Sequence, residues 1–176
     1  MLVRALVLAI ALVAGCSNIR TGSEFDLAAD FQNYKSYAWV TDELTLIGTG
    51  TGNPRVRNEN NEKLIRAAID RELAKHGYQK VEMAEAELVV TFAVGLREQI
   101  RIEGADTTYG LLASSGETPK FYEGSLTIDL FERATRRHIW HGWGREALER
   151  EAEAKVVIDE AVGEIMKHFP PEKSAG

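Results

Sequence analysis

The 176-residue chain contains a single cysteine, Cys16, so it cannot form an intramolecular disulfide. Its fold must therefore be stabilised by core packing alone. The sequence also lacks an apolar run of the ~20 residues that a membrane-spanning helix needs. The uncharged run that follows Arg4 ends at Cys16, and the polar residue Ser17 comes next. A spanning anchor is therefore disfavoured.

Positive charge is also scarce, because 21 Lys and Arg residues face 27 Asp and Glu residues. Residues 1–15 include one basic residue, Arg4, and no acid, so the rest of the chain carries 20 minus 27, or −7. Such a surface repels polyphosphates, and no basic stripe with interleaved aromatic residues is present. The sequence therefore predicts no nucleic-acid partner.

The start of the chain has the three parts of a secretory signal. Residues 1–15 carry one basic residue, an apolar run from Ala5 to Val13 and a small pair, Ala14-Gly15. Val13-Ala14-Gly15-Cys16 resembles a bacterial lipobox, in which the cysteine is lipidated and becomes the first mature residue. A buried free cysteine beside an ordinary cleavage site is the alternative. We predict a signal peptide over 1–15 and membrane attachment through lipidated Cys16.

The residue after the cysteine indicates the destination. Ser17 follows Cys16, whereas Asp at that position resembles an inner-membrane retention signal. We therefore expect the periplasmic face of the outer membrane. Residues 16–22 are predicted to be a tether, and the span from Cys16 to the first strand residues near Glu24 reaches at most ~28 Å. The domain should lie close to the bilayer.

Residues 23–171 carry the periodicities of one domain. Alternating apolar residues predict strands over 23–30, 34–40, 88–102, 122–131 and 138–145. Three- and four-residue spacing predicts amphipathic helices over 57–76 and 154–169. The clear alternation indicates one covered and one wetter sheet face, which is typical of antiparallel pairing. We predict an α+β fold: an antiparallel sheet of about five strands with two helices packed on one face.

Short motifs occur along this domain in order: Asp30-Phe31-x-x-Tyr34-Lys35-x-Tyr37-x-Trp39, Asn53-Pro54, His76-Gly77-Tyr78, Ala86-Glu87-Leu88-Val89-Val90, Gly124-x-Leu126-x-Ile128-x-Leu130, Ile139-Trp140-x-Gly142 and Phe169-Pro170-Pro171. Together they resemble the DUF4136 domain found in Gram-negative lipoproteins. Glu87 stands where Asp is usual, and the last hairpin lacks a glycine around Arg136. The resemblance implies a fold and an envelope location, but no activity or catalytic residues.

The histidines do not form an obvious metal site. His138 and His141 have HxxH spacing, but residues three apart on a regular strand point to opposite faces, so we expect them not to share an ion. His76 and His168 lie near predicted helix ends, where a cation is favoured anyway. We predict no bound metal and no cofactor.

Signatures of catalysis are also missing. The mature chain has no free thiol and no Gly-x-Ser-x-Gly elbow. Asp129 with Glu123 or Glu132 could flank a glycosidic bond, but abundant acids are more typical of a solvated face. The glycines at 48, 50 and 52 lack the strand-to-helix context and the lysine of a phosphate-binding loop. We predict that the protein is not an enzyme.

Aromatic residues are the remaining candidates for ligand contact. They are Trp39, Trp140 and Trp143 on predicted strands, and Tyr109 in the glycine-rich loop 103–120, which is either functional or mobile. Packing against the protein's own helices is the alternative role for the strand residues. Trp140 and Trp143 have opposite parity, so at most one faces the core of a regular strand.

These features predict a non-catalytic periplasmic lipoprotein that binds an envelope protein or a peptidoglycan-like polymer through the open sheet face and the loop 103–120. A carrier of lipid or another apolar ligand between sheet and helices is the alternative. Residues 172–176 are predicted to be a tail. The sequence does not indicate an oligomeric state.

Overall fold

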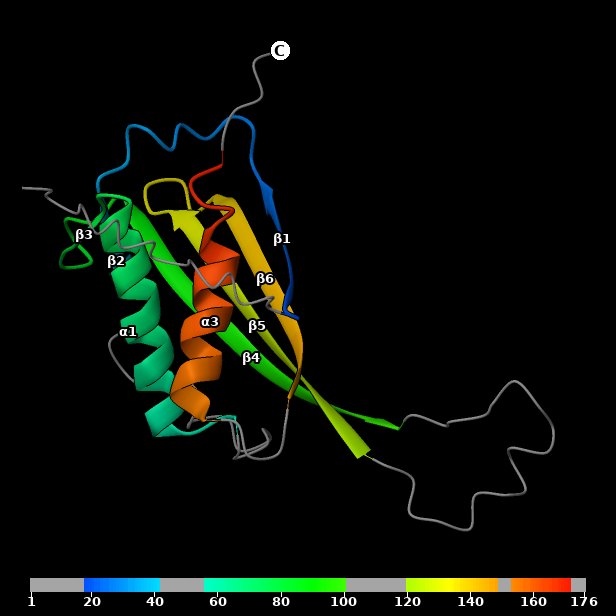
Figure 1. Cartoon of the computed structure of the whole chain (residues 1–176). Helices are drawn as coiled ribbons and strands as arrows, with labels where there is room; N and C mark the ends of the chain where they lie inside the picture. Colours follow the sequence, from blue (N-terminus) through cyan, green and yellow to red (C-terminus); the bar gives the residue numbers. More distant parts are fainter. Residues whose placement is uncertain (1–17, 42–55, 101–119, 149–152, 172–176) are drawn as a thin grey trace, which may run out of the picture.

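The computed structural model describes residues 18–41, 56–100, 120–148 and 153–171, which form an α+β fold with a six-stranded sheet and two helices (Figure 1). This confirms the fold class predicted from the sequence. No helix within these ranges is long and apolar enough to cross a membrane. Cys16, Tyr109, residues 103–119 of the predicted loop and the tail lie outside the described residues.

Three long strands form the centre of the sheet, and their alternating apolar residues determine which face is buried. β4 (Leu88–Ile100), β5 (Lys120–Glu132) and β6 (His138–Leu148) pair antiparallel in sequence order. Every second residue of a strand points to the same face. Ile128 and Leu130 of β5 are accordingly fully buried beneath the helices.

The edges of the sheet differ from the prediction. The strand order is β1-β6-β5-β4-β2-β3, with β1 (Arg20–Phe25) antiparallel to β6. However, β2 (Ser36–Trp39) runs parallel to both β4 and the two-residue β3 (Gln79–Lys80). The sheet is therefore mixed, with six strands rather than about five. A helical crossover after β2 allows the chain to return in the same direction. The alternation of apolar and polar residues in the sequence indicates that one sheet face is covered, but it does not indicate the direction of each strand.

Both helices cover the same face of the sheet (Figure 1). In α1 (Glu59–Lys75), the Asn58 side chain accepts a hydrogen bond of 2.9 Å from the Asn61 backbone N–H and so caps the first turn. Gly77, just after this helix, has φ 85°, the left-handed conformation in which many helices end. The second helix, α3 (Ala154–Met166), contacts α1 and β6.

Phe169 connects distant parts of the chain within the core. Its ring lies 5.2 Å from that of Trp140, 5.3 Å from that of Tyr78 and 5.8 Å from that of Phe31, measured between centroids. The Tyr78 hydroxyl donates to the Phe31 carbonyl at 2.9 Å. Each aromatic pair contributes about 0.5–1.5 kcal/mol beyond the burial of its surface. The segment after α3 is thereby fastened to β6, to the end of α1 and to the loop after β1.

The first strand begins and ends earlier than the sequence predicted. β1 starts at Arg20, three residues before the predicted start of the domain, and stops at Phe25. The Asp26 side chain accepts a hydrogen bond of 2.8 Å from the Ala28 backbone N–H, which turns the chain away from the sheet. Leu27, which lies within the predicted strand 23–30, is outside β1 and is 76% exposed.

We expect Gly142→Ala to destabilise the fold by about 3 kcal/mol or more in urea unfolding of the full chain. A Cβ at Gly142 would lie 2.1 Å from Trp140 Cη2 and 2.7 Å from Ile165 Cγ2, and both of those side chains are fully packed. Gly163→Ala in α3 is the matched control. A Cβ there meets nothing within 4 Å, so better helix propensity should stabilise by about 1 kcal/mol. Equal midpoints for Gly142→Ala and the unmodified chain would contradict this packing.

Candidate functional site

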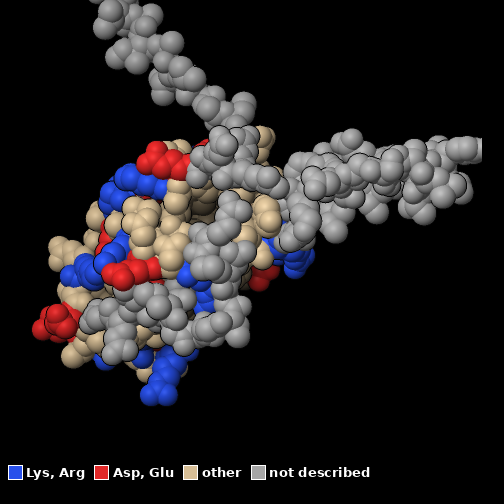
Figure 2. Space-filling view, turned by 90° about the horizontal axis from the view of Figure 1, so that it is seen from below, with Lys and Arg blue, Asp and Glu red and all other residues tan. Residues whose placement is uncertain are grey.

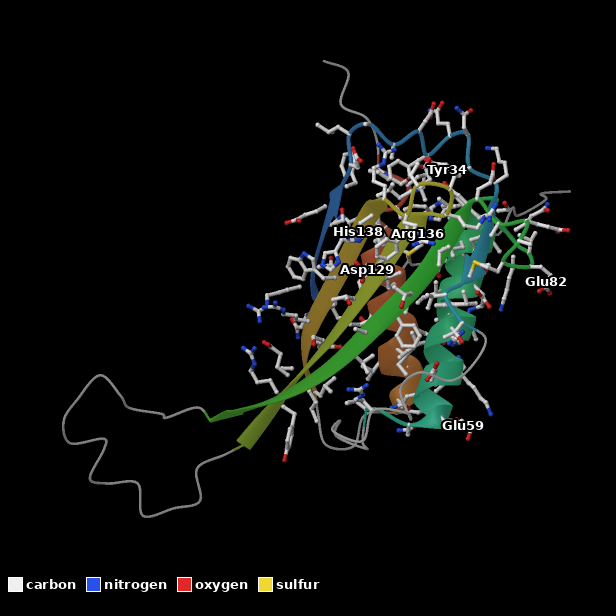
Figure 3. All side chains as sticks on the ribbon, turned by 180° about the vertical axis from the view of Figure 1, so that it is seen from behind. Tyr34, Glu59, Glu82, Asp129, Arg136 and His138 are labelled. Atoms are coloured by element: carbon white, nitrogen blue, oxygen red, sulfur yellow. The ribbon has the colours of Figure 1, made fainter. Side chains whose placement is uncertain are left out.

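A polar groove lies on the sheet face that the helices leave uncovered. Figure 3 shows this face of the sheet, from the side opposite to Figure 1. Its volume is about 480 Å³, and β1, β4, β5 and β6 all contribute to it. Its charged and aromatic lining consists of Glu24, Arg97, Glu123, His141, Trp143 and Arg145. The groove therefore offers both signs of charge together with one indole ring.

A glycine in the neighbouring strand β1 determines how the ring of Trp143 lies. A Cβ on its cross-strand partner Gly22 would come within 2.7 Å of Trp143 Cζ2, so the ring packs directly over the backbone of β1. The Arg145 guanidinium lies 5.6 Å from the ring centroid. Trp143 remains half-buried and lines the groove. The indole is thus part of the surface and rests on the sheet edge.

The other two tryptophans are core residues. Trp39 is 3% exposed and Trp140 is 1% exposed, and both belong to the hydrophobic core. Trp39 Nε1 donates to Asp70 of α1 at 3.0 Å, and Arg66 lies 4.7 Å from its ring centroid. Both side chains are therefore buried away from the groove, and ligand contact by either residue stays a prediction. The prediction that at most one of Trp140 and Trp143 faces the core is confirmed.

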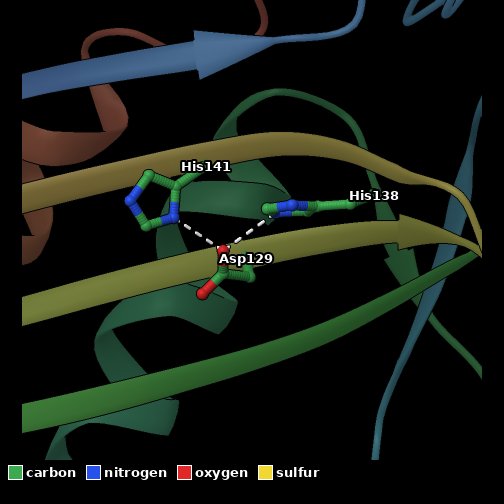
Figure 4. A group of neighbouring side chains, drawn as sticks. All are labelled: Asp129, His138 and His141. Atoms are coloured by element: carbon green, nitrogen blue, oxygen red, sulfur yellow. Dashed lines mark hydrogen bonds and ion pairs between the residues drawn. The ribbon is translucent and has the colours of Figure 1, made fainter.

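A cluster of Asp129, His138 and His141 lies on the same open face (Figure 4). Asp129 Oδ1 is 2.7 Å from His141 Nδ1 and 2.9 Å from His138 Nε2. The closest ligand atoms of the three side chains all lie within 4.8 Å of one another. Asp129 and His141 are direct cross-strand partners in β5 and β6, so the backbone register places them side by side.

The position of His138 overturns the expectation that the two histidines point to opposite faces. The register of β5 with β6 shifts between Leu130 and Phe131, so that Leu130 pairs with Trp140 but Phe131 pairs with His138. Ile139 is the extra residue of this β-bulge, and it changes the side on which His138 emerges. Both Ile139 and Trp140 are buried. In the sequence these are two consecutive large apolar residues, which break the strict alternation of apolar and polar positions. This break could have revealed the bulge.

The adjoining turn restrains His138. Its ring stacks on Phe131 at a centroid distance of 4.6 Å and an interplanar angle of 22°. At the turn, Arg136 takes the left-handed φ of 60°, where the family resemblance led us to expect glycine. Glu132 accepts hydrogen bonds from Thr135 and Tyr34, and these hold the pKa of its carboxyl below the ordinary value. Packing and hydrogen bonds thus fix the hairpin that presents the cluster.

The helix-covered face offers little room for a ligand at its described hollow. An apolar space of about 90 Å³ lies between the sheet and α3, lined by residues such as Val94, Leu126 and Ile158. This is well below the roughly 300–1,000 Å³ of typical ligand pockets. Such a space does not hold an acyl chain, so it does not support the apolar-carrier hypothesis.

Charge is mixed on the described surface. On the end of the molecule seen in Figure 2, basic and acidic side chains lie interspersed and do not gather into one basic patch. At the groove, Glu123 pairs at 2.8 Å with Arg20, which lies outside the lining, and this pairing offsets one of the groove's acids. Neither surface offers the continuous positive field that binds a nucleic-acid backbone.

Comparison with known proteins identifies a family and related folds. The model of DUF4136, a domain of unknown function, matches residues 21–171. No curated protein matches the chain. A PDZ domain protein from Parabacteroides distasonis is similar in structure with a TM-score of 0.55 and 18% identity, over 89% of this chain and 36% of that protein. The chain therefore spans about a third of that protein's length.

A second solved structure, a PelC dodecamer from Paraburkholderia phytofirmans, is similar with a TM-score of 0.49 and 11% identity, over 84% of this chain and 94% of that chain. At these identities, structural similarity concerns the fold alone. The site must therefore be interpreted from the residues of this chain.

Glu146 of β6 is a further titratable group, on the helix-covered side of the strand. Burial, and then the nearby Glu160 of α3, raise the pKa of its carboxyl above the ordinary value. Its Oε2 atom is buried without a hydrogen-bond partner among the described residues. The folded state therefore disfavours the charged form of this carboxyl.

We expect Glu146→Gln to raise the free energy of unfolding at pH 8 and to have little effect at pH 4. While Glu146 is protonated in both the folded and the unfolded state, its raised pKa does not lower the free energy of unfolding. This free energy falls as pH rises through the folded-state pKa, because the unfolded state loses the proton more readily. Urea unfolding at the two pH values measures the difference. Glu82→Gln, at an exposed position, is the matched control. A gain that is larger at pH 4 than at pH 8 would contradict the assignment.

Proposed function

The chain belongs to the DUF4136 family, and from this premise we propose that it is a non-catalytic lipoprotein at the periplasmic face of the outer membrane. In this proposal lipidated Cys16 anchors the protein, and the groove on the open sheet face binds a peptidoglycan-like polymer. The single observation that carries the binding proposal is the 480 Å³ groove that combines Trp143 with Arg97 and Arg145.

The anchor proposal is supported by the lipobox-like Val13-Ala14-Gly15-Cys16 and by the start of the sheet. Since β1 begins at Arg20, only four Cα–Cα steps separate it from Cys16, or at most about 14 Å. This distance is half the reach expected from the sequence. Because Glu24 of β1 lines the groove, a lipid on Cys16 would hold the groove near the membrane surface.

The groove chemistry matches a polymer that carries sugars and short charged peptides. An indole ring packs on the apolar face of a sugar, as aromatic side chains pack on other flat surfaces. Arg97 and Arg145 can form charge-assisted hydrogen bonds with carboxylates, and Glu24 can accept one from an amine. A purely anionic or purely apolar partner would leave part of this lining unpaired.

We expect the detergent-solubilised full-length protein to bind purified peptidoglycan sacculi, and Trp143→Ala to weaken that binding about tenfold, or 1.4 kcal/mol. Arg97→Ala tests the same groove without disturbing the packing over Gly22. Arg71→Ala, at a half-exposed arginine of α1 that pairs with Asp159 of α3 and does not line the groove, is the matched control. Unchanged binding in both groove variants would overturn the polymer proposal. The polymer proposal would also be overturned if the unmodified protein did not bind sacculi and a crosslinker placed at position 143 captured one envelope protein.

We expect Cys16→Ala to abolish lipid attachment and to leave the precursor largely uncleaved, because the lipidated cysteine defines the cleavage point. Metabolic labelling with palmitate and the apparent mass of the protein measure both effects. Ser17→Ala is the control, since it retains the cysteine and the preceding lipobox-like residues. Palmitate incorporation by Cys16→Ala would disprove the anchor.

A further inference from the structure

We propose that Asp129, His138 and His141 form a binding site for a divalent transition metal, with Zn²⁺ as the representative ion. The site lies on the open sheet face, and His141 also lines the groove. The proposal does not depend on polymer binding, because its ligand atoms come entirely from this chain.

The chemistry of the donor set favours transition metals. Two imidazole nitrogens and one carboxylate oxygen bind Zn²⁺, Cu²⁺ or Ni²⁺, whereas Mg²⁺ and Ca²⁺ prefer sets made of oxygen atoms. The donor atoms are His138 Nε2, His141 Nδ1 and Asp129 Oδ1. Each histidine thus directs a nitrogen at the same carboxylate oxygen.

The distances between the donor atoms suit one shared ion. In tetrahedral zinc with bonds of about 2.0–2.1 Å, neighbouring donor atoms lie about 3.3 Å apart. The two measured nitrogen–oxygen distances are 2.7 and 2.9 Å, and the three donors lie within 4.8 Å of one another. An ion bound between them would move both nitrogen atoms about half an ångström away from the carboxylate oxygen, a shift within the reach of side-chain rotation.

The strands preorganise the site. Asp129 and His141 are fixed as cross-strand partners, and the bulge at Ile139 brings His138 to the same face. The stack on Phe131 restricts the ring of His138. Fixing the donors before the ion arrives reduces the conformational entropy lost on binding. The bulge therefore places both histidines on one face of the sheet, which a regular strand could not do.

The charges around the cluster also favour a cation. Glu24 of β1 is the cross-strand partner of His141, so a second carboxylate lies beside the site. The neighbouring Arg137 is paired with Asp26 at 3.2 Å and with Glu132 at 3.8 Å. Three protein donors leave a fourth tetrahedral position for a water molecule.

The test is a Zn²⁺ titration of the full-length protein in detergent, stripped with EDTA and monitored with a competing chromophoric chelator. We expect one Zn²⁺ per chain with a dissociation constant in the micromolar range or below, and no competition from excess Mg²⁺. His138→Ala, His141→Ala and Asp129→Asn should each weaken binding at least about tenfold. His138 and His141 are 45% and 32% exposed, so their replacement leaves the core intact.

His76→Ala and His168→Ala are the matched controls, because they replace the two histidines outside the cluster. Both should bind Zn²⁺ as the unmodified protein does. The proposal is overturned if no stoichiometric binding occurs below about 1 mM, or if the control variants lose binding while His138→Ala and His141→Ala keep it. Circular dichroism of each variant distinguishes loss of a ligand from loss of the fold.

Discussion

The pairing of β5 with β6 is the interaction on which both faces of the sheet depend. On the helix side, Gly142 and Gly144 of β6 allow Ile165 of α3 to approach the backbone closely. On the other side, the same strand presents His141 and Trp143. At these two glycine positions α3 therefore packs directly against the backbone of β6 beside the buried Trp140, while His141 and Trp143 lie on the open face.

Much of the fold was predictable because its signals are local. The helices follow from the spacing of their apolar residues, and Gly77 follows from the need for a left-handed residue after α1. Apolar and polar residues alternate along the long strands, because one face of the sheet packs against helices and the other meets water. These signals depend on neighbours within a few residues, so one sequence suffices to detect them.

The features that were missed depend on pairing between distant segments. The parallel direction of β2 is decided by the crossover through α1, and the two-residue β3 is too short to show a period. The bulge at Ile139 depends on how β6 aligns with β5. For the same reason the sequence could not separate Trp143, which lies over Gly22 at the surface, from Trp39, which is hydrogen-bonded to Asp70 in the interior.

In the proposed function, the short link between Cys16 and β1 explains why a shallow groove would suffice. A protein held at a membrane samples nearby partners at a high effective concentration, so each contact can be individually weak. A half-exposed indole and solvent-facing arginines provide contacts of this strength, because water competes with them. A metal ion on Asp129, His138 and His141 would add a stronger, directional element at one side of the same surface. Anchoring and modest recognition are therefore physically consistent in one small domain.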